Sequence, residues 1–216
     1  MSWDSAYHRD KKIWGEKPSE LASFALEHLS KIPFKKCNIL DIGCGYGRDA
    51  IYLSEKTGCS VLGIDCSAYA IRMANDSVPN QGNQTVKFLC SDFDAMQEKG
   101  SDIMFASNLY QVLHPADRLR FREFIQRKLE ADGLFFMSTM AVGDHEHWGK
   151  GKPVSGEETS YEDEKYLHFC SREELIRDFG FLQIRELVEH EFFEPRSDGA
   201  THHHNSWLLF GIKRES

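Results

Sequence analysis

Short hydrophobic stretches alternate with helical patterns along most of the chain. The stretches of strand length lie at residues 37–42, 60–65, 86–90, 102–107 and 133–139. Between them, hydrophobic positions recur at helical spacing over 48–56, 67–77 and 115–131. Such alternation is typical of a parallel sheet covered by helices on both faces. We therefore predict an α/β fold with a doubly wound, Rossmann-like sheet.

The C-terminal part departs from this alternation. A helix whose N-cap is Ser171, with Glu174 completing a capping box, precedes two long strand patterns at 181–194 and 201–213. The short sequence PRSDGA joins these two patterns. A short turn between two strand patterns favours an antiparallel hairpin. The sheet is therefore expected to be mostly parallel, with a reversed C-terminal strand.

We expect one domain over residues 1–216, with two segments outside the regular alternation. Residues 1–36 contain helical patterns near 3–14 and 18–30, and the first carries aromatic residues that suit a flap over a pocket. Residues 141–168 are polar and irregular, and they are longer than an ordinary connection between elements. This insertion is predicted to act as a lid.

Charge and composition exclude several classes of protein. Lys and Arg number 26 and Asp and Glu number 34, which gives a net charge of −8 that disfavours nucleic acid as a partner. No signal peptide or membrane-spanning stretch is recognisable, so we expect a cytoplasmic protein. The six cysteines include no CxxC pair, and they are expected to be reduced thiols.

The first predicted strand leads into the sequence ILDIGCGYG. Its glycines, Gly43, Gly45 and Gly47, are spaced differently from a dinucleotide fingerprint, in which the third small residue would come one position later. The strand also ends in Asp41, whose charge would repel a pyrophosphate. A ligand with a cationic group and no phosphate reverses the sign of this interaction. S-adenosylmethionine, which carries a sulfonium and an ammonium, meets that requirement.

Two further carboxylates follow the next two strands. Asp65 ends the second strand, where adenosine-containing cofactors bind their ribose, and Ser67 beside it is a natural N-cap. Asp92 and Phe93 follow the third strand, where they are expected to contact the adenine. We therefore expect these four residues at the cofactor.

With these motifs, the chain resembles the class I S-adenosylmethionine-dependent methyltransferases. The sequence ILDIGCGYG, Asp65 and the sequence SDF look like motifs I, II and III of that family, from about residue 18 to the C-terminus. WDSAYHRDKKIWGEKPSEL and KYLHFCSREEL look most similar to small-molecule methyltransferases of the tellurite-resistance and thiopurine type. The resemblance implies S-adenosyl-L-methionine as the cofactor and a small molecule as the methyl acceptor.

The end of the fourth strand, ASNLYQVLH, would correspond to motif IV of that family. There Asn108 is expected beside the cofactor, Tyr110 in the substrate pocket, and His114 as a candidate catalytic base. DNA amino-methyltransferases carry (N/D)PP(Y/F) at this place. Because this chain reads Asn-Leu-Tyr-Gln, methylation of a DNA amino group is disfavoured.

Aromatic and histidine side chains complete the expected site. Trp14 of the N-terminal flap is assigned to the cofactor, and the substrate pocket is assigned Tyr7, Trp148, His202 and His204. His145 of the insertion is a second candidate base. In a strand, His203 would face away from the histidines on either side of it, so a metal site would need ligands from the insertion. No metal was therefore expected.

Several alternatives stay open at this point. An anionic thiol, selenide or metalloid acceptor needs no base, whereas a hydroxyl or an amine does. A nicotinamide-dependent oxidoreductase on a similar sheet is a second possibility, opposed by Asp41 and by the glycine spacing. A third is a non-catalytic protein that binds the cofactor or a metalloid.

Overall fold

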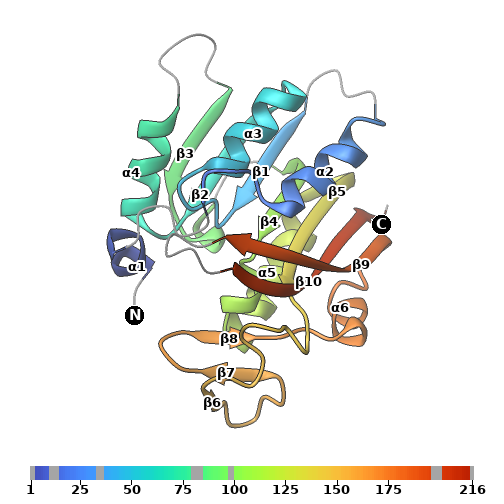
Figure 1. The fold of residues 1–216 in the computed structure, drawn as a ribbon. Helices are drawn as coiled ribbons and strands as arrows, with labels where there is room; N and C mark the ends of the chain where they lie inside the picture. Colours follow the sequence, from blue (N-terminus) through green and yellow to red (C-terminus); the bar gives the residue numbers. More distant parts are fainter. Residues whose placement is uncertain are drawn as a thin grey trace.

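The computed structural model describes residues 3–9, 15–32, 37–78, 85–96, 100–195 and 201–214. Within these residues one large sheet runs through the molecule, in the strand order β3-β2-β1-β4-β5-β10-β9 (Figure 1). The first five strands in chain order are mutually parallel, and β10 is antiparallel to both of its neighbours. The strands are β1 (Asn38–Ile42), β2 (Ser60–Asp65), β3 (Val86–Cys90), β4 (Ser101–Ser107), β5 (Leu129–Met140), β9 (Leu182–Pro195) and β10 (Thr201–Lys213). The predicted fold class and the reversed C-terminal strand are confirmed.

Helices cover both faces of the sheet. Alternating residues of one strand enter different cores: Ile39 packs with residues of α2 and α3, whereas Leu40 packs with Phe121 and Phe124 of α5. This alternation follows from the two-residue period of a strand whose two faces are both buried. The helices are α2 (Glu20–Leu29), α3 (Arg48–Thr57), α4 (Ala68–Ser77), α5 (Pro115–Lys128) and α6 (Arg172–Asp178).

One helix boundary differs from its prediction. The pattern over 115–131 extends the helix three residues too far, because Leu129 already pairs with Ser101 and begins β5. Asp132, with φ 58°, then bends the strand through a left-handed residue at an irregularity in the pairing. Helical spacing cannot reveal this early exit, since Leu129 is apolar and fits either element.

The insertion at 141–168 is more regular than its composition indicates. It contains a small antiparallel sheet of β6 (Lys152–Pro153), β7 (Ser160–Glu162) and β8 (Tyr166–His168), which lies below the main sheet in Figure 1. Arg118 of α5 anchors this sheet by donating to the Tyr166 hydroxyl and to Glu157. The expectation of an irregular segment was therefore wrong for these strands.

The N-terminal flap is partly described. The helix α1 (Trp3–Arg9) lies beside α4, and the carboxylate of Asp4 accepts hydrogen bonds from the Ser67 hydroxyl and the Tyr69 amide. Residues 10–14 lie outside the described part of the chain, so the predicted helix over 3–14 is tested only for its first half. That half is helical.

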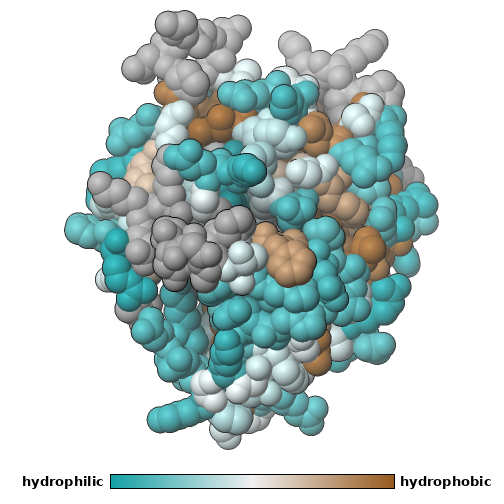
Figure 2. Space-filling view, in the orientation of Figure 1, coloured by the Kyte–Doolittle hydropathy of each residue, from teal (hydrophilic) through white to brown (hydrophobic). Residues whose placement is uncertain are grey.

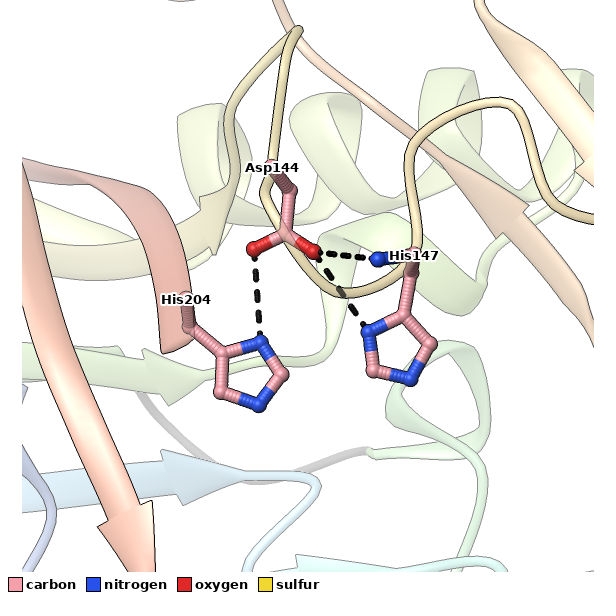
Figure 3. A group of neighbouring side chains, drawn as sticks. All are labelled: Asp144, His147 and His204. Atoms are coloured by element: carbon pink, nitrogen blue, oxygen red, sulfur yellow. Dashed lines mark hydrogen bonds and ion pairs between the residues drawn. The ribbon is translucent and has the colours of Figure 1, made fainter. Parts of the chain in front are cut away.

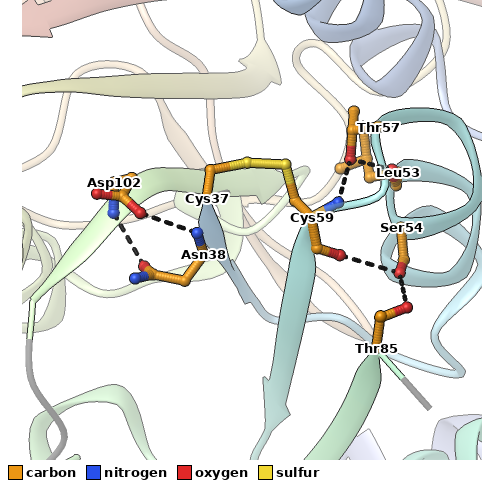
Figure 4. Close-up of a disulfide and its surroundings, with 8 residues drawn as sticks. All are labelled: Cys37, Asn38, Leu53, Ser54, Thr57, Cys59, Thr85 and Asp102. Atoms are coloured by element: carbon orange, nitrogen blue, oxygen red, sulfur yellow. Dashed lines mark hydrogen bonds between the residues drawn. A yellow bond between two sulfur atoms is a disulfide. The ribbon is translucent and has the colours of Figure 1, made fainter. Parts of the chain in front are cut away.

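Two cysteines form a disulfide, which corrects the expectation of six reduced thiols (Figure 4). Cys37 and Cys59 immediately precede β1 and β2, and the register pairs Asn38 with Ser60. Their Cα atoms are consequently 5.0 Å apart, a separation that a disulfide can bridge. Sequence alone could not show this pairing, because 22 residues separate the two cysteines and only the parallel register brings them together. The other four cysteines are free.

The surface is mainly polar on the face drawn in Figure 2. Hydrophilic residues dominate its lower part, where Figure 1 places the insertion, and hydrophobic residues emerge in separate small groups. Among the described helices, none is both long enough and apolar enough to cross a membrane.

Candidate active site

One cavity opens at the carboxyl edge of the parallel strands. The ends of β1, β2 and β4, the turn at 43–47, the segment after β3 and the helix α1 all contribute to its lining. A cavity at this edge is the usual ligand position in a doubly wound fold, because connections leave the sheet there in opposite directions. The residues that line it therefore define the candidate active site.

The glycine turn uses its backbone amides internally. The amides of Gly43 and Cys44 both donate to the Ile64 carbonyl, at 2.8 and 2.9 Å, and the amide of Gly47 donates to the Cys44 carbonyl. The Gly45 amide donates to Asp65 Oδ2 at 2.9 Å. These four amides are thus committed to the fold, whereas a phosphate-binding loop points its amides at the ligand. The turn is poorly suited to a pyrophosphate.

Left-handed backbone explains why glycine is required at Gly47. Its φ is 81°, and a Cβ atom there would lie 2.4 Å from Cζ of Phe88. Any other residue would strain the backbone and collide with that ring. The glycine spacing therefore reflects both the turn and the close packing of α3 against β3.

Asp41 is a buried carboxylate with an unsatisfied oxygen. The residue is 2% exposed and lines the cavity, and its Oδ2 has no hydrogen-bond partner among the described residues. Burial raises the pKa of Asp41 well above its ordinary value, and the neighbouring carboxylates of Asp49 and Asp65 raise it further. A buried acceptor without a donor is costly. The site thus favours a ligand that brings a cation or a donor to Asp41.

Asp65 is held by the backbone on both of its oxygens. Oδ2 accepts from the Gly45 amide and Oδ1 accepts from the Ser67 amide, at 2.9 and 2.8 Å. Burial raises the pKa of Asp65, although these two hydrogen bonds oppose the rise. Ser67 itself lies outside the cavity lining, because its hydroxyl caps α4 and contacts Asp4. The fixed carboxylate remains able to accept further hydrogen bonds, since each oxygen has more than one acceptor position.

Asp49 is a lining residue that the sequence analysis missed. It is the second residue of α3 and is 5% exposed, and burial raises its pKa. Its Oδ1 accepts from the Ser19 amide at 2.7 Å, which joins the start of α2 to the start of α3. An acidic residue in a helical first turn directly after the glycine turn was the available signal. Three buried carboxylates, those of Asp41, Asp49 and Asp65, therefore surround the turn.

Asp92 and Phe93 lie where the sequence places them, on the cavity wall after β3. Asp92 begins the short 3-10 helix η1 (Phe93–Ala95) and accepts from the Asp94 amide. The ring of Phe93 packs against Phe121 and Phe124, with centroids 5.7 Å apart in each case. Phe93 thus belongs to the core and also presents a surface to the cavity.

The far side of the cavity is formed by α1 and by the residues after β4. Asn108 has a left-handed φ of 54°, and its amide donates to the Ser138 carbonyl at 3.1 Å. Tyr7 is buried, with its ring edge-on to Tyr46. Both line the cavity, as does Trp3, while Trp14 lies outside the described residues.

Tyr110 does not reach the cavity, contrary to the sequence analysis. The residue belongs to the 3-10 helix η2 (Tyr110–Val112) and is completely buried. Its hydroxyl donates to Asp178 at 2.8 Å and accepts from Arg122. The residue after Leu109 turns inward, so a motif-based alignment could not give its direction. Tyr110 is a core residue.

The two predicted bases also lie outside the cavity lining. His114 precedes α5 and packs against the ring of Tyr166 in a tilted arrangement, with centroids 4.2 Å apart. His145 stacks on His203 at 4.1 Å and lies near Glu191 on the exposed edge of the hairpin. Among the described residues, no histidine lines the cavity.

The remaining predicted pocket residues gather on the insertion and β10. Trp148 packs edge-on against Tyr161 and Phe169 within the insertion. His202 and His204 lie on β10 near the first turn of the insertion, with ring centroids 6.0 Å apart. None of these three lines the cavity.

Comparison with known proteins identifies a domain family over the centre of the chain. Residues 39–133 match the family described as "Methyltransferase domain". Sterol 24-C-methyltransferase erg6 of Schizosaccharomyces pombe is 23% identical over 230 residues, covering 99% of this chain and 60% of that protein. The chain spans 47% to 60% of the length of the first curated relatives it matches.

Solved structures share the fold. An S-adenosylmethionine-dependent methyltransferase of Methanosarcina mazei superimposes with a TM-score of 0.73 at 19% identity, covering 88% of this chain and 98% of the other. TehB of Haemophilus influenzae superimposes with a TM-score of 0.68 at 17% identity, covering 88% and 62%.

Proposed function

We propose, from the premise that residues 39–133 form a methyltransferase domain, that this chain is an S-adenosylmethionine-dependent methyltransferase acting on a small molecule. The observation that carries the proposal is the buried Oδ2 of Asp41, which lines the cavity and has no hydrogen-bond partner among the described residues. When bound, S-adenosylmethionine supplies a methyl group activated by a positively charged sulfur.

The residues around the glycine turn fit the charge of this cofactor. Asp41, Asp49 and Asp65 make the inner end of the cavity acidic, and burial weakens the screening of their charge by water. The methionine end of the cofactor carries two positive charges, on its sulfonium and its ammonium. We assign Asp41 and the backbone of the turn at 43–47 to this end.

The adenosine end of the cofactor is assigned to the residues at the ends of β2 and β3. Asp65, whose carboxylate is fixed by two backbone amides, would accept from the ribose hydroxyls. Asp92 and Phe93 would meet the adenine, the first through its carboxylate and the second through its ring. These assignments follow the order of β1, β2 and β3 along the cavity.

The acceptor is assigned to the side formed by α1, Asn108 and Leu109. The apolar side chains of Leu109, Val112 and Leu113 and the aromatic rings of Trp3 and Tyr7 line this side. Positioning supplies most of the catalysis of an in-line displacement. The proposed role of α1 is to cover the reacting atoms and exclude water.

The titratable groups of the cavity limit which acceptors could be deprotonated there. His114 and His145 lie elsewhere, and no imidazole of the described residues lines the cavity to take a proton. We therefore favour acceptors that are already nucleophilic near neutral pH, such as thiolates, selenides or metalloid anions. A hydroxyl acceptor would need one of the cavity carboxylates as its base.

Calorimetric titration with S-adenosylhomocysteine tests the cofactor site. The wild-type chain is expected to bind it with micromolar affinity and to show no heat with NAD. Asp65→Ala should weaken binding at least about tenfold, because two hydrogen bonds to a charged acceptor would be lost. Asp76→Asn, an exposed charge change on α4, is the matched control and should bind like wild type.

Binding of NAD in place of S-adenosylhomocysteine would refute the assignment of the cofactor.

An acceptor screen with radiolabelled methyl donor then tests the substrate class. His114→Gln should keep kcat/KM within about threefold of wild type for a thiol acceptor, and a loss of 100-fold or more would restore His114 as a base.

A further inference from the structure

Asp144, His147 and His204 meet where the first turn of the insertion contacts β10 (Figure 3). Nδ1 of His204 lies 3.3 Å from Asp144 Oδ2, and Nδ1 of His147 lies 3.4 Å from Asp144 Oδ1. Asp144 is 2% exposed and His204 is 4% exposed. Two imidazoles thus converge on one buried carboxylate.

The local backbone fixes this arrangement. The turn begins at the end of β5, where the Asp144 amide donates to the Ala141 carbonyl. The side chain of Asp144 accepts from the amides of His147 and Asn205, each at 2.8 Å. The carboxylate therefore holds the turn against β10 and sets the positions of both imidazoles.

Hydrogen-bond donors surround the carboxylate of Asp144. Burial alone would raise the pKa of Asp144, but the neighbouring imidazoles of His147 and His204 and the backbone amides of His147 and Asn205 outweigh burial and hold this pKa well below the ordinary range. A carboxylate therefore stands beside two imidazole nitrogens.

We propose that Asp144, His147 and His204 form a binding site for a divalent transition-metal ion, with Zn²⁺ as the first candidate. Imidazole nitrogen and carboxylate oxygen are established ligands of zinc at about 2.0–2.2 Å. Ligand atoms at such distances from one ion lie about 3.0–3.5 Å from each other, and the two separations between imidazole nitrogen and carboxylate oxygen here, 3.3 and 3.4 Å, fall in this range. The ligand atoms of the three residues all lie within 4.8 Å of one another.

A second observation supports the site independently. Nδ1 of His147 is buried and makes no hydrogen bond within the described part of the chain, although Asp144 Oδ1 is near. His202 lies beside this cluster, and its Nδ1 is also buried without a hydrogen-bond partner among the described residues. Buried polar atoms normally have partners. A metal ion would satisfy the His147 nitrogen.

Two other clusters of possible ligands lack a buried ligand atom without a hydrogen-bond partner among the described residues. In the group of His168, Cys170 and Glu174, both ring nitrogens of His168 already have partners, Ser160 and Glu174, each at 2.9 Å. The group of His145, Glu191 and His203 is largely exposed. The second group supplies a control of the same chemistry on the same strand.

The proposed metal would tie the insertion to the sheet. The turn at 141–148 precedes the small sheet of β6, β7 and β8, and β10 lies next to β5 in the main sheet. A metal bound by residues of both would fix the start of the insertion at the carboxyl edge of the sheet. This is a positioning role, separate from the cofactor cavity.

Zinc titration of the full chain after treatment with EDTA and dialysis tests the proposal. Wild type is expected to bind one equivalent of Zn²⁺ with micromolar or tighter affinity, and Co²⁺ is expected to produce the visible absorption of a site with nitrogen and oxygen ligands. His147→Gln should weaken binding at least about tenfold and abolish the Co²⁺ spectrum. His203→Gln, in the exposed cluster, should behave like wild type.

Folding is checked separately, by comparing thermal unfolding in EDTA. His147→Gln and wild type should unfold at similar temperatures without metal, and only wild type and His203→Gln should be stabilised by Zn²⁺. The proposal is overturned if wild type binds no stoichiometric metal, or if His147→Gln binds as well as wild type. S-adenosylhomocysteine binding, measured in parallel, reports on the cofactor site independently.

Discussion

Asp41 and Asp144 are equally buried, at 2% exposure each, yet their pKa values shift in opposite directions. Asp41 lies in the cavity, with other carboxylates as neighbours and one oxygen without a partner. Asp144 lies in the first turn of the insertion, with backbone amides and two imidazoles around it. The two residues have the same exposed fraction, but hydrogen-bond donors surround the carboxylate of Asp144, whereas burial and neighbouring carboxylates dominate at Asp41.

The comparison separates two uses of a buried carboxylate. The chain itself satisfies Asp144, which therefore stabilises the fold as an anion. Asp41 is left for a ligand to satisfy, and until one binds it costs stability whenever it is ionised. A carboxylate kept at such a cost is a sign of function.

The largest expected effect is that of Asp41→Asn. Affinity for S-adenosylhomocysteine should fall at least about 30-fold, because removing one partner of a buried charge interaction costs about 2–5 kcal/mol. The same variant should be more stable than wild type by about 0.5–2 kcal/mol at neutral pH, the usual size of a single stabilising change. Calorimetry and urea unfolding measure the two effects.

The stability gained by Asp41→Asn relative to wild type should depend on pH in one direction. The pKa of Asp41 is raised in the folded state, so ionisation favours the unfolded chain once the pH exceeds the unfolded value of about 4. The stability difference between Asp41→Asn and wild type should therefore be small near pH 4 and grow toward pH 7. A constant difference across that range would show that the charge of Asp41 is not its cause.

Asp144→Asn should have the opposite effect on stability. In EDTA, the free energy of unfolding should fall by about 1.5–3 kcal/mol, because hydrogen bonds to a charged acceptor are replaced by weaker ones. Affinity for S-adenosylhomocysteine should change little, since Asp144 does not line the cavity. If both aspartate variants shifted stability in the same direction, the contrast between the two carboxylates would be lost.

A pair of tyrosines gives the smallest and most local test. Tyr110→Phe should lose about 1 kcal/mol of stability with its hydrogen bond to Asp178, while kcat/KM stays unchanged. Tyr7→Phe keeps the ring that lines the cavity, so any loss of kcat/KM reports its hydroxyl alone. Loss of activity in Tyr110→Phe, without loss of stability, would return Tyr110 to the substrate pocket.

The strands, the glycine turn and the acidic residues at or just after the ends of β1, β2 and β3 could be predicted from the sequence. Each depends on local spacing: hydrophobic stretches, glycines in a turn, and a carboxylate at a strand end. The directions of Tyr110 and His114 could not be predicted, because each follows an irregular turn whose path is set by packing against α6 or the insertion.

Contacts between segments distant in the sequence also could not be predicted. Asp49 bonds to Ser19, and Asp144 meets His204 across 60 residues. Strand periodicity correctly placed His202 and His204 on one face, but nothing in the spacing indicated that Asp144 and His147 would join them. Tertiary structure alone brings these groups together.

The cross-link between Cys37 and Cys59 divides the protein into two covalent species that differ by two hydrogen atoms. Alkylation before mass spectrometry would label four cysteines in one species and six in the other. The bond joins the starts of β1 and β2, at the edge of the sheet opposite the cavity. An assay buffer that contains dithiothreitol therefore selects which species is being measured, even though the reagent acts far from the glycine turn.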